Sequence, residues 1–204
     1  DAGGAQVAVD PNGDVIAVWH AHDGTRDDIW SNRYTPGVGW GTPELIEHDD
    51  TADAFNAQLV ADPTGHVTAV WPRWDGGVGA PAGIWSNRYT PGVGWGTPEP
   101  LATDYGPGPP LLVADPTGHV TAVWPQSAGL LSDRYTLSVG WGAAELVDAG
   151  NAAGPLFPAD MGVSPNGDVI VAWTQSGVSA GKSWSIIWSK LYTPGVGWGT
   201  AEVI

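Results

Sequence analysis

A run of sixteen residues at positions 29–44 returns without a single change at positions 84–99. Both copies read Ile-Trp-Ser-Asn-Arg-Tyr-Thr-Pro-Gly-Val-Gly-Trp-Gly-Thr-Pro-Glu. A diverged third copy spans 130–142, and a fourth spans 187–200. Repetition at a period of about 50 residues means that the chain is built from copies of one structural unit, each completed by its neighbours. We expect one domain with four repeats, at approximately 5–56, 57–109, 110–158 and 159–204.

Each repeat opens with a short apolar segment and a four-residue turn. The turn reads Asp-Pro-Asn-Gly or Asp-Pro-Thr-Gly in three repeats and Ser-Pro-Asn-Gly in the fourth. Asp or Ser accepts a hydrogen bond at the first position, Pro presets φ at the second, and Gly supplies the positive φ required at the fourth. The pattern predicts β-hairpins with turns at 10–13, 62–65, 115–118 and 164–167.

The segment after each turn is a nearly continuous apolar run that ends in Trp, which predicts a strand covered on both faces. The third strand alternates, so that Ser31 and Arg33 lie on one face and Asn32 and Tyr34 on the other. A fourth strand is expected at about 40–46. The Trp residues that end the second strands are Trp19, Trp71, Trp124 and Trp173.

Four strands per repeat, with 52, 53 and 49 residues between these Trp residues, fit the blade of a β-propeller. The 30 Gly and 18 Pro exclude a helical solenoid, and a parallel β-helix needs shorter rungs. The predicted fold is therefore an all-β β-propeller with four blades of four antiparallel strands. Small residues on the first strands suit a narrow axis, so we expect one ring closed within a single chain. The alternative is that the chain forms half of an eight-bladed ring made by two chains. The first arrangement predicts a monomer and the second a homodimer.

The charge balance narrows the range of partners. A net charge of −15, with only seven Lys and Arg, disfavours nucleic acid and anionic membranes, because both are bound through basic side chains. No apolar run is long enough to span a bilayer, so membrane insertion is not expected. The first residue is Asp rather than Met, as in a processed protein, and we expect a secreted or cell-surface location.

The repeat resembles the Trp-rich bacterial β-propeller repeats of secreted proteins. The residues that carry the likeness are the Ala-Val-Trp ending at Trp19, the stretch 29–34 and the Gly-Trp-Gly-Thr at 39–42. Members of this loose group are similar to propeller lectins. The resemblance implies a propeller that binds surface ligands, and it says little about which ligand.

Catalytic patterns are weak. Arg33, Arg88 and Arg134 occupy equivalent places in three repeats, and we expect them to stack on aromatic rings or pair with Asp rather than form one site. The five His show no metal-ligand spacing, and no nucleophile elbow or phosphate loop occurs. We therefore expect a protein that is not an enzyme, has no catalytic residues, and requires no cofactor.

Acidic residues cluster between the repeats, at Asp49, Asp50, Asp53, Asp104 and Asp148. Their carboxylates are suitable Ca²⁺ ligands, but they form no Ca²⁺-binding loop motif. We interpret them as solvated loops; Ca²⁺ stays an alternative, and any metal site is left unassigned.

Two Trp residues lie outside the repeated positions. Trp74 and Trp184 fall in the loops between the second and third strands, which differ from repeat to repeat and share one face with the acidic crossings. Exposed aromatic rings beside acidic side chains are typical of sugar sites. We predict a ligand site that comprises Trp74, Trp184, Asp75, Arg73 and Asp23.

The leading hypothesis is a non-enzymatic extracellular module that binds a glycan or a cell-surface protein through this variable loop face. The first alternative is a structural or protein-interaction propeller, and a lesser one is a glycoside hydrolase, which needs two carboxylates at one bond.

Overall fold

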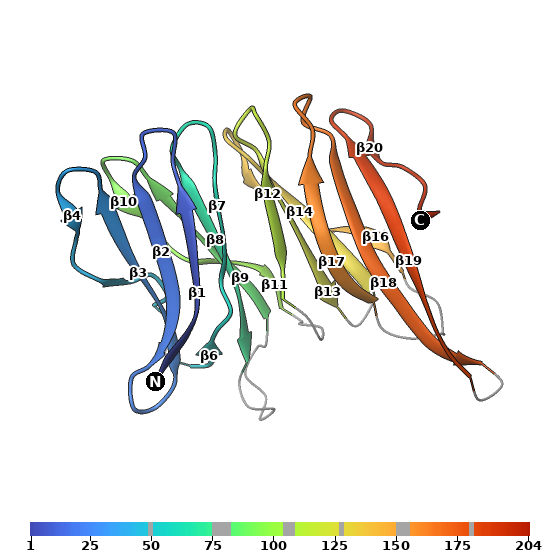
Figure 1. The fold of residues 1–204 in the computed structure, drawn as a ribbon, viewed down its shortest axis with the longest axis horizontal. Coiled ribbons are helices and arrows are strands. Elements are labelled where there is room, and N and C mark those ends of the chain that lie inside the picture. The colour runs from blue at the N-terminus through green and yellow to red at the C-terminus, as the bar shows by residue number, and fades with distance from the viewer. Residues whose placement is uncertain (49–50, 75–82, 104–108, 127–128, 150–155, 180–181) are drawn as a thin grey trace. The chain divides into compact units, whose positions relative to one another are not determined.

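The computed structural model describes residues 1–48, 51–74, 83–103, 109–126, 129–149, 156–179 and 182–204. The chain divides into two compact units, residues 1–105 and 106–204, and each contains two of the repeats (Figure 1). The described residues form no helix that could cross a membrane.

Unit 1 consists of two antiparallel sheets, sheet A from the first repeat and sheet B from the second. In each sheet the long strands pair in sequence order, and the last short strand returns to pair with the long third one. Sheet A contains β1 (Ala2–Val9), β2 (Val15–His22), β3 (Asp27–Thr35), β4 (Gly39–Trp40) and β5 (Glu44–Leu45). Sheet B contains β6 (Asp53–Ala54), β7 (Gln58–Ala61), β8 (Val67–Trp74), β9 (Gly83–Thr90), β10 (Gly94–Trp95) and β11 (Glu99–Ala102).

Unit 2 repeats the arrangement, with sheet C from the third repeat and sheet D from the fourth. Sheet C contains β12 (Leu111–Ala114), β13 (Val120–Gln126), β14 (Gly129–Thr136), β15 (Gly140–Trp141) and β16 (Glu145–Asp148). Sheet D contains β17 (Leu156–Val163), β18 (Val169–Ser179), β19 (Lys182–Thr193), β20 (Gly197–Trp198) and β21 (Glu202–Val203). The prediction of an all-β chain with four antiparallel sheets is confirmed.

The predicted hairpin turns form as expected. In the first, the amide of Gly13 donates to the carbonyl of Asp10 at 3.0 Å, and the amide of Asn12 donates to the Asp10 carboxylate at 2.8 Å. Gly13 has φ = 84°, which an L side chain rarely adopts. A Cβ at Gly13 would lie 3.6 Å from Pro36 in the next turn of the same repeat. Both turns of a repeat therefore lie at one end of the sheet, and the loops between second and third strands lie at the other (Figure 1).

The fourth strand differs from the prediction. Where one strand was expected at 40–46, two short strands, β4 and β5, both pair with β3. The interruption follows Trp40, where the amide of Gly41 donates to the carbonyl of Arg33 at 2.8 Å. The same bond recurs in sheet D, where the amide of Gly199 donates to the carbonyl of Leu191 at 2.8 Å and the strand is interrupted in the same way although Ala201 replaces Pro43.

The second strands were expected to be covered on both faces, and this is confirmed for β8 and β13, which are buried along nearly their whole length. It is wrong for the other two. Strand β2 alternates between buried and partly exposed residues, and in β18 Ile170 is exposed between the buried Val169 and Val171. One face of sheet A and one face of sheet D therefore remain open.

The two sheets of each unit pack face to face. In unit 1, the aliphatic residues Ile16, Val18 and Ile29 of sheet A pack against Trp71 and Tyr89 of sheet B. In unit 2, Val123, Leu130 and Val147 of sheet C pack with Val171 and Trp173 of sheet D.

One polar contact accompanies this packing in both units. The indole Nε1 of Trp95 in sheet B donates to the hydroxyl of Ser31 in sheet A at 3.1 Å. The same bond joins Trp198 of sheet D to Ser132 of sheet C at 2.8 Å. We call the face of a sheet that carries this indole its donor face, and the face that carries the Ser hydroxyl its acceptor face.

Candidate functional site

The strand ends opposite the turns bring polar side chains together in unit 1. A cavity of about 420 Å³ is lined there by Asp1 and Ala2 of the N-terminus, His20 and His22 of β2, and Asp27 of β3. Residues from three neighbouring strands meet because antiparallel strands place alternate chain ends at the same edge. We call this cavity, together with Asp53 and Trp74, the loop-end site.

The imidazole of His20 packs directly against the backbone of Gly3 and Gly4. A Cβ added to Gly3 would lie 3.0 Å from His20 Nε2, and one added to Gly4 would lie 2.8 Å from Nδ1. The register between β1 and β2 shifts at this point, and Gly4 has φ = 62°. The bulge and the missing side chains thus make the space that the ring occupies, so the Gly3–Gly4 pair positions His20 at the cavity.

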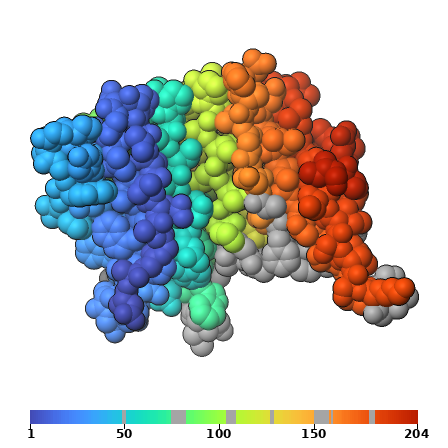
Figure 2. Space-filling view, in the orientation of Figure 1, coloured from blue at the N-terminus to red at the C-terminus, as the bar shows by residue number. Residues whose placement is uncertain are grey.

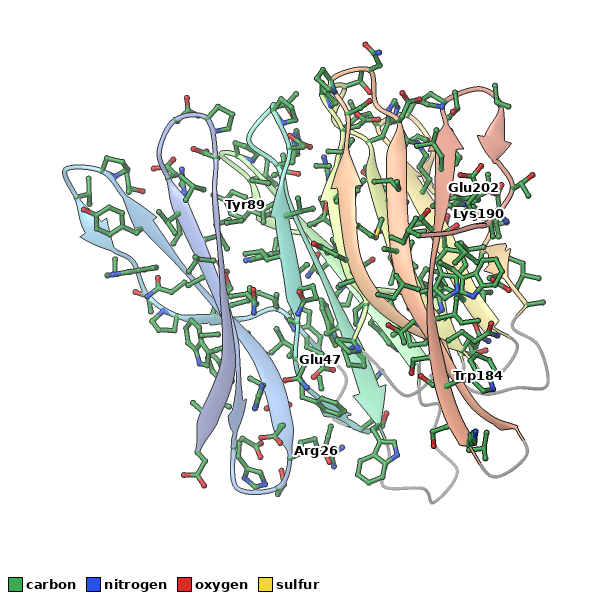
Figure 3. All side chains as sticks on the ribbon, turned by 45° about the vertical axis from the view of Figure 1, so that its right-hand side comes forward. Arg26, Glu47, Tyr89, Trp184, Lys190 and Glu202 are labelled. Atoms are coloured by element: carbon green, nitrogen blue, oxygen red, sulfur yellow. The ribbon has the colours of Figure 1, made fainter. Side chains whose placement is uncertain are left out.

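The loop from His22 to Asp27 is closed by local hydrogen bonds. The Asp23 carboxylate accepts from the Thr25 hydroxyl and amide, both at 2.7 Å, and from the Arg26 amide at 3.0 Å. The Thr25 hydroxyl bond, with these amide bonds, lowers the pKa of Asp23 to about 2. Asp23, predicted as a ligand contact, is exposed in the loop beside the cavity. One of its oxygens accepts the hydrogen bonds that order this loop, in which Arg26 is labelled in Figure 3.

His22 has a defined tautomer in its neutral form. Its Nδ1 accepts from the amide of Gly24 at 3.0 Å, so the proton of the neutral ring is on Nε2. His22 therefore presents an N–H donor beside the carboxylate acceptors Asp1 and Asp27, which line the same cavity.

Trp74 connects to this cavity through Asp53. Trp74 is the last residue of β8 and lies opposite Asp53 of β6 in the register of sheet B. The Asp53 carboxylate accepts from the amide of Asp27 at 3.1 Å. Trp74 is 49% exposed, as predicted for a ring that the fold does not require. It belongs to a strand rather than to a loop, which differs from the sequence interpretation.

Arg73 is in the interior, contrary to its prediction as a ligand contact. It is 1% exposed, its guanidinium lies over the Trp85 ring at 4.7 Å, and Nη2 donates to the Thr51 hydroxyl at 3.1 Å. Side chains alternate along a strand, so the residue before an exposed Trp74 must face the sheet's packed side. Asp75, also predicted, lies outside the described residues.

Trp184 lies in the other unit. The expected loop at 174–185 is instead a hairpin arm, because β18 and β19 continue pairing to Ser179 and Lys182; Figure 2 shows the arm projecting in orange. Trp184 is half-buried, lies opposite Gly177, and is labelled on the arm in Figure 3. Of the predicted set, Trp74 and Asp23 belong to the same end of unit 1, and Trp184 is part of a separate feature.

The three repeated Arg residues are structural, as predicted. Arg33 pairs with Asp14, Arg88 with Asp62 and Arg134 with Asp115. Two of them also lie over a Tyr of the neighbouring sheet: Arg33 over Tyr89 at 5.6 Å and Arg134 over Tyr192 at 5.1 Å.

The contacts of Asp62 and Asp115 lower the pKa values of these two carboxyl groups. Burial alone would raise the pKa of Asp62, but hydrogen bonds from Thr64 and the Arg88 guanidinium hold it below its ordinary value. Asp115 behaves in the same way with Thr117 and Arg134.

A second, smaller cavity of about 100 Å³ lies between sheets C and D. Asp133 and Glu145 line it together with Arg134, Tyr192 and Trp198. Burial raises the pKa of Asp133, and the nearby negative charge of Glu145 adds to the effect, although the amides of Arg134 and Gly142 donate to its carboxylate. Sequence reasoning missed this residue, although its signal is visible: Asp133 stands where two other repeats have Asn.

Metal binding receives no support from the part of the chain that is described, because no group of three or more His, Asp or Glu is arranged there to hold an ion. Of the acids considered for Ca²⁺, Asp53 accepts a hydrogen bond from the amide of Asp27, and Asp148 is the last residue of β16. Asp49, Asp50 and Asp104 lie outside the described residues. The prediction that no cofactor is required stays a prediction.

No protein-family model matches the chain, and no curated protein matches it. Solved structures do match. An ulvan lyase of polysaccharide lyase family PL25 aligns with a TM-score of 0.63 and 10% identity over 97% of this chain and 52% of its own. Polysaccharide lyase Uly1 aligns with a TM-score of 0.59 and 10% identity over 98% of this chain and 59% of its own. A glycosyl hydrolase from Bacteroides ovatus aligns with a TM-score of 0.50 and 9% identity over 98% and 70%.

These matches define the class of protein by its fold. Four antiparallel sheets of the blade type, matched along nearly the whole chain by propeller structures, make the protein β-propeller-like. The chain spans between about half and seven tenths of the length of the structures named above. At identities of 9–10% the likeness shows the fold and not an activity.

Proposed function

We propose that this chain is a non-enzymatic carbohydrate-binding module of a secreted or cell-surface protein, and that it binds a glycan at the loop-end site. The observation that carries the proposal is an open polar cavity in sheet A with an exposed indole on the neighbouring sheet B. Trp74 lies opposite Asp53, and the Asp53 carboxylate accepts a hydrogen bond from the amide of Asp27, which lines the cavity. The carbohydrate-active enzymes among the matched structures support the ligand class.

The dimensions and chemistry of the cavity suit a sugar. Ligand pockets in proteins are typically about 300–1,000 Å³. The loop-end cavity, at about 420 Å³, falls in this range. Carboxylates of Asp1 and Asp27 accept hydrogen bonds from sugar hydroxyls, the Nε2–H of His22 donates one, and the Trp74 indole covers the apolar C–H face of a pyranose. No lysine or arginine is among the described residues that line the cavity, so a neutral glycan fits better than an anionic one.

A glycan array followed by calorimetry on the selected glycan tests the proposal. Trp74→Ala and Asp27→Ala should each weaken binding at least tenfold without a change in melting temperature. Val38→Ala, at an exposed position in the turn at the opposite end of sheet A, is the matched control and should bind like the parent. Trp184→Ala reports whether the hairpin arm also contributes. Loss of stability with unchanged affinity in Trp74→Ala would refute the site.

Hydrolysis is the second candidate, and one observation favours it: Asp133 has a raised pKa and shares a cavity with Glu145, as an acid and a base of a glycosidase would. The cavity volume argues against it, because about 100 Å³ is well below a typical ligand pocket of about 300 Å³ or more. Reducing-end release from neutral polysaccharides decides between the two. Activity that disappears in both Asp133→Asn and Glu145→Gln would establish the enzyme and overturn the non-enzymatic proposal.

A further inference from the structure

The contact between sheets follows one rule in both units. A donor face with Trp and Tyr covers an acceptor face with Ser and aliphatic residues, and an indole N–H bonds the Ser hydroxyl. An additional bond joins the strand edges: Asn87 donates to the carbonyl of Ile46 at 3.0 Å in unit 1. In unit 2, Lys190 donates to the equivalent carbonyl of Val147 at 2.6 Å. The contact is therefore specified by repeat positions and occurs in both units.

Sheet A presents a complete donor face that is open. Trp40, the counterpart of Trp95, is 55% exposed, and its ring makes an edge contact with Tyr34, with centroids 5.5 Å apart. Val7 and Val9 of β1 are exposed on the same face, and β1 is the dark blue strand at the surface in Figure 2. Asn32, Tyr34 and Trp40 are identical to Asn87, Tyr89 and Trp95, which lie at the equivalent positions on the donor face of sheet B.

Sheet D presents an acceptor face whose aliphatic residues are open, although its Ser189 is buried. Ile204 is 74% exposed, although its counterpart Ile46 in sheet A is fully buried. Ile187 is 47% exposed, although its counterpart Ile29 is also fully buried. These residues carry the apolar surface that the same positions bury in unit 1, where a donor face covers them.

We propose that the donor face of sheet A binds the acceptor face of sheet D of a second copy of this chain. The two faces fit by the rule seen twice inside the chain, since Trp40 supplies the indole donor and Ser189 supplies the hydroxyl at the position of Ser31. Two residues depart from the rule: Leu191 stands where Arg33 lies over Tyr89, and Ala172 stands where Val18 packs in unit 1. Leu191 and the exposed Ile170 make this contact with Tyr34 apolar instead of cationic. Because the chain carries a net charge of −15, an apolar contact strengthens as salt screens the repulsion between copies.

The test compares two one-face variants of the whole chain. Val9→Glu blocks the donor face of sheet A, and Ile204→Glu blocks the acceptor face of sheet D. Val196→Glu, at an exposed turn position of sheet D, is the matched control for added charge. Mass is measured by light scattering and sedimentation over about a hundredfold range of concentration, because association follows mass action. Circular dichroism confirms that each variant is folded.

The expected result has four parts. The parent and the control associate, reaching at least twice the 21.1 kDa chain, and do so more strongly at higher salt. Each one-face variant is monomeric, with association weakened at least tenfold. An equimolar mixture of the two variants restores a 1:1 complex, because each still carries one intact face.

A parent that stays at 21.1 kDa at every concentration overturns the proposal. In that case, reduced melting temperatures of both one-face variants would indicate closure within a single chain. Unchanged melting temperatures would mean that these faces are occupied by something other than a copy of the chain. Association that survives in both variants, or a mixture that forms no complex, also refutes the stated pairing.

Discussion

The indole Nε1 of Trp95 bonds the hydroxyl of Ser31 at 3.1 Å across 64 residues of sequence and between two sheets. Ser31 is buried, and the Trp95 ring packs edge-on against Tyr89 at 5.8 Å between centroids. The hydrogen bond fixes the rotation of the indole, and the ring contact holds it against its own sheet. This pair of contacts sets the register of sheet B on sheet A, and Trp198 with Ser132 does the same in unit 2.

Removing this hydroxyl should destabilise unit 1. Ser31→Ala leaves the indole N–H without its acceptor, which costs about 1–3 kcal/mol of the free energy of unfolding. Trp95→Phe should cost a similar amount, and the double variant should cost less than the sum. A double-mutant cycle in urea measures the coupling; strictly additive losses would show that the bond contributes nothing.

The buried Trp residues of the second strands should be far more sensitive than the exposed ones. Trp71 is fully buried, and Trp71→Ala should lower the free energy of unfolding by about 3–5 kcal/mol, as other large core truncations do. Trp40→Ala, at a ring more than half exposed, should cost about 1 kcal/mol or less in the monomer. Thermal melting of the two variants side by side checks the difference. Equal melting temperatures would mean that the faces of these strands are assigned wrongly.

Asp133 should make the protein less stable as the pH rises. Its pKa is raised in the folded state, so its contribution is fully present below the unfolded value of 3.8 and is lost as pH rises through the folded value. Asp133→Asn removes this pH-dependent loss. The new side-chain amide can also donate to the carbonyl of Gly142, as Asn87 does to the equivalent Gly96 in sheet B, and such a bond contributes about 1 kcal/mol. In urea unfolding at a series of pH values, the free energy of unfolding of the variant should rise relative to that of the parent from acid to neutral pH. A difference that does not change with pH would remove the titration of Asp133 from the explanation.

Asp23 should control local order without much effect on global stability. Its pKa is lowered to about 2, so its loop bonds are complete above the unfolded value of 3.8 and are lost as pH falls toward 2. In Asp23→Ala the amides of Thr25 and Arg26 should exchange hydrogen faster at pH 5, while Asp23→Asn, which keeps the acceptor oxygen, should protect them largely as the parent does. Exchange measured by NMR decides; equal protection in all three proteins would contradict this account of the loop.

Local patterns predicted the fold well because they depend on near neighbours. The turn at Asp10 and the alternation of Ser31 and Arg33 are determined by a few adjacent positions, and the pairing of Arg33 with Asp14 needs only the hairpin of its own repeat. Exposure is different. Trp40 and Trp95 lie in the same sixteen-residue sequence, yet only Trp95 finds a Ser acceptor in a neighbouring sheet. No reading of either copy alone distinguishes them, because the difference lies in what packs against the sheet.

The candidate site was only partly predictable for a related reason. Trp74 was identifiable as a Trp that the repeat does not require. The burial of Arg73 follows from how far β8 extends, and the cavity follows from a bulge at Gly4 that seats His20. Strand ends and bulges depend on pairing across the sheet, which the sequence of one strand does not specify.

Every repeat carries an indole donor on one face and a hydroxyl acceptor on the other. One sheet can therefore replace another without losing the groups that make the contact. Unequal recombination within the gene, which near-identical segments such as 29–44 and 84–99 promote, would insert or remove a sheet whose neighbours already fit it. Repeat number can therefore change during evolution without new contacts having to be invented. The positions Asp133, Lys190 and Leu191 mark where the third and fourth copies differ from the first two.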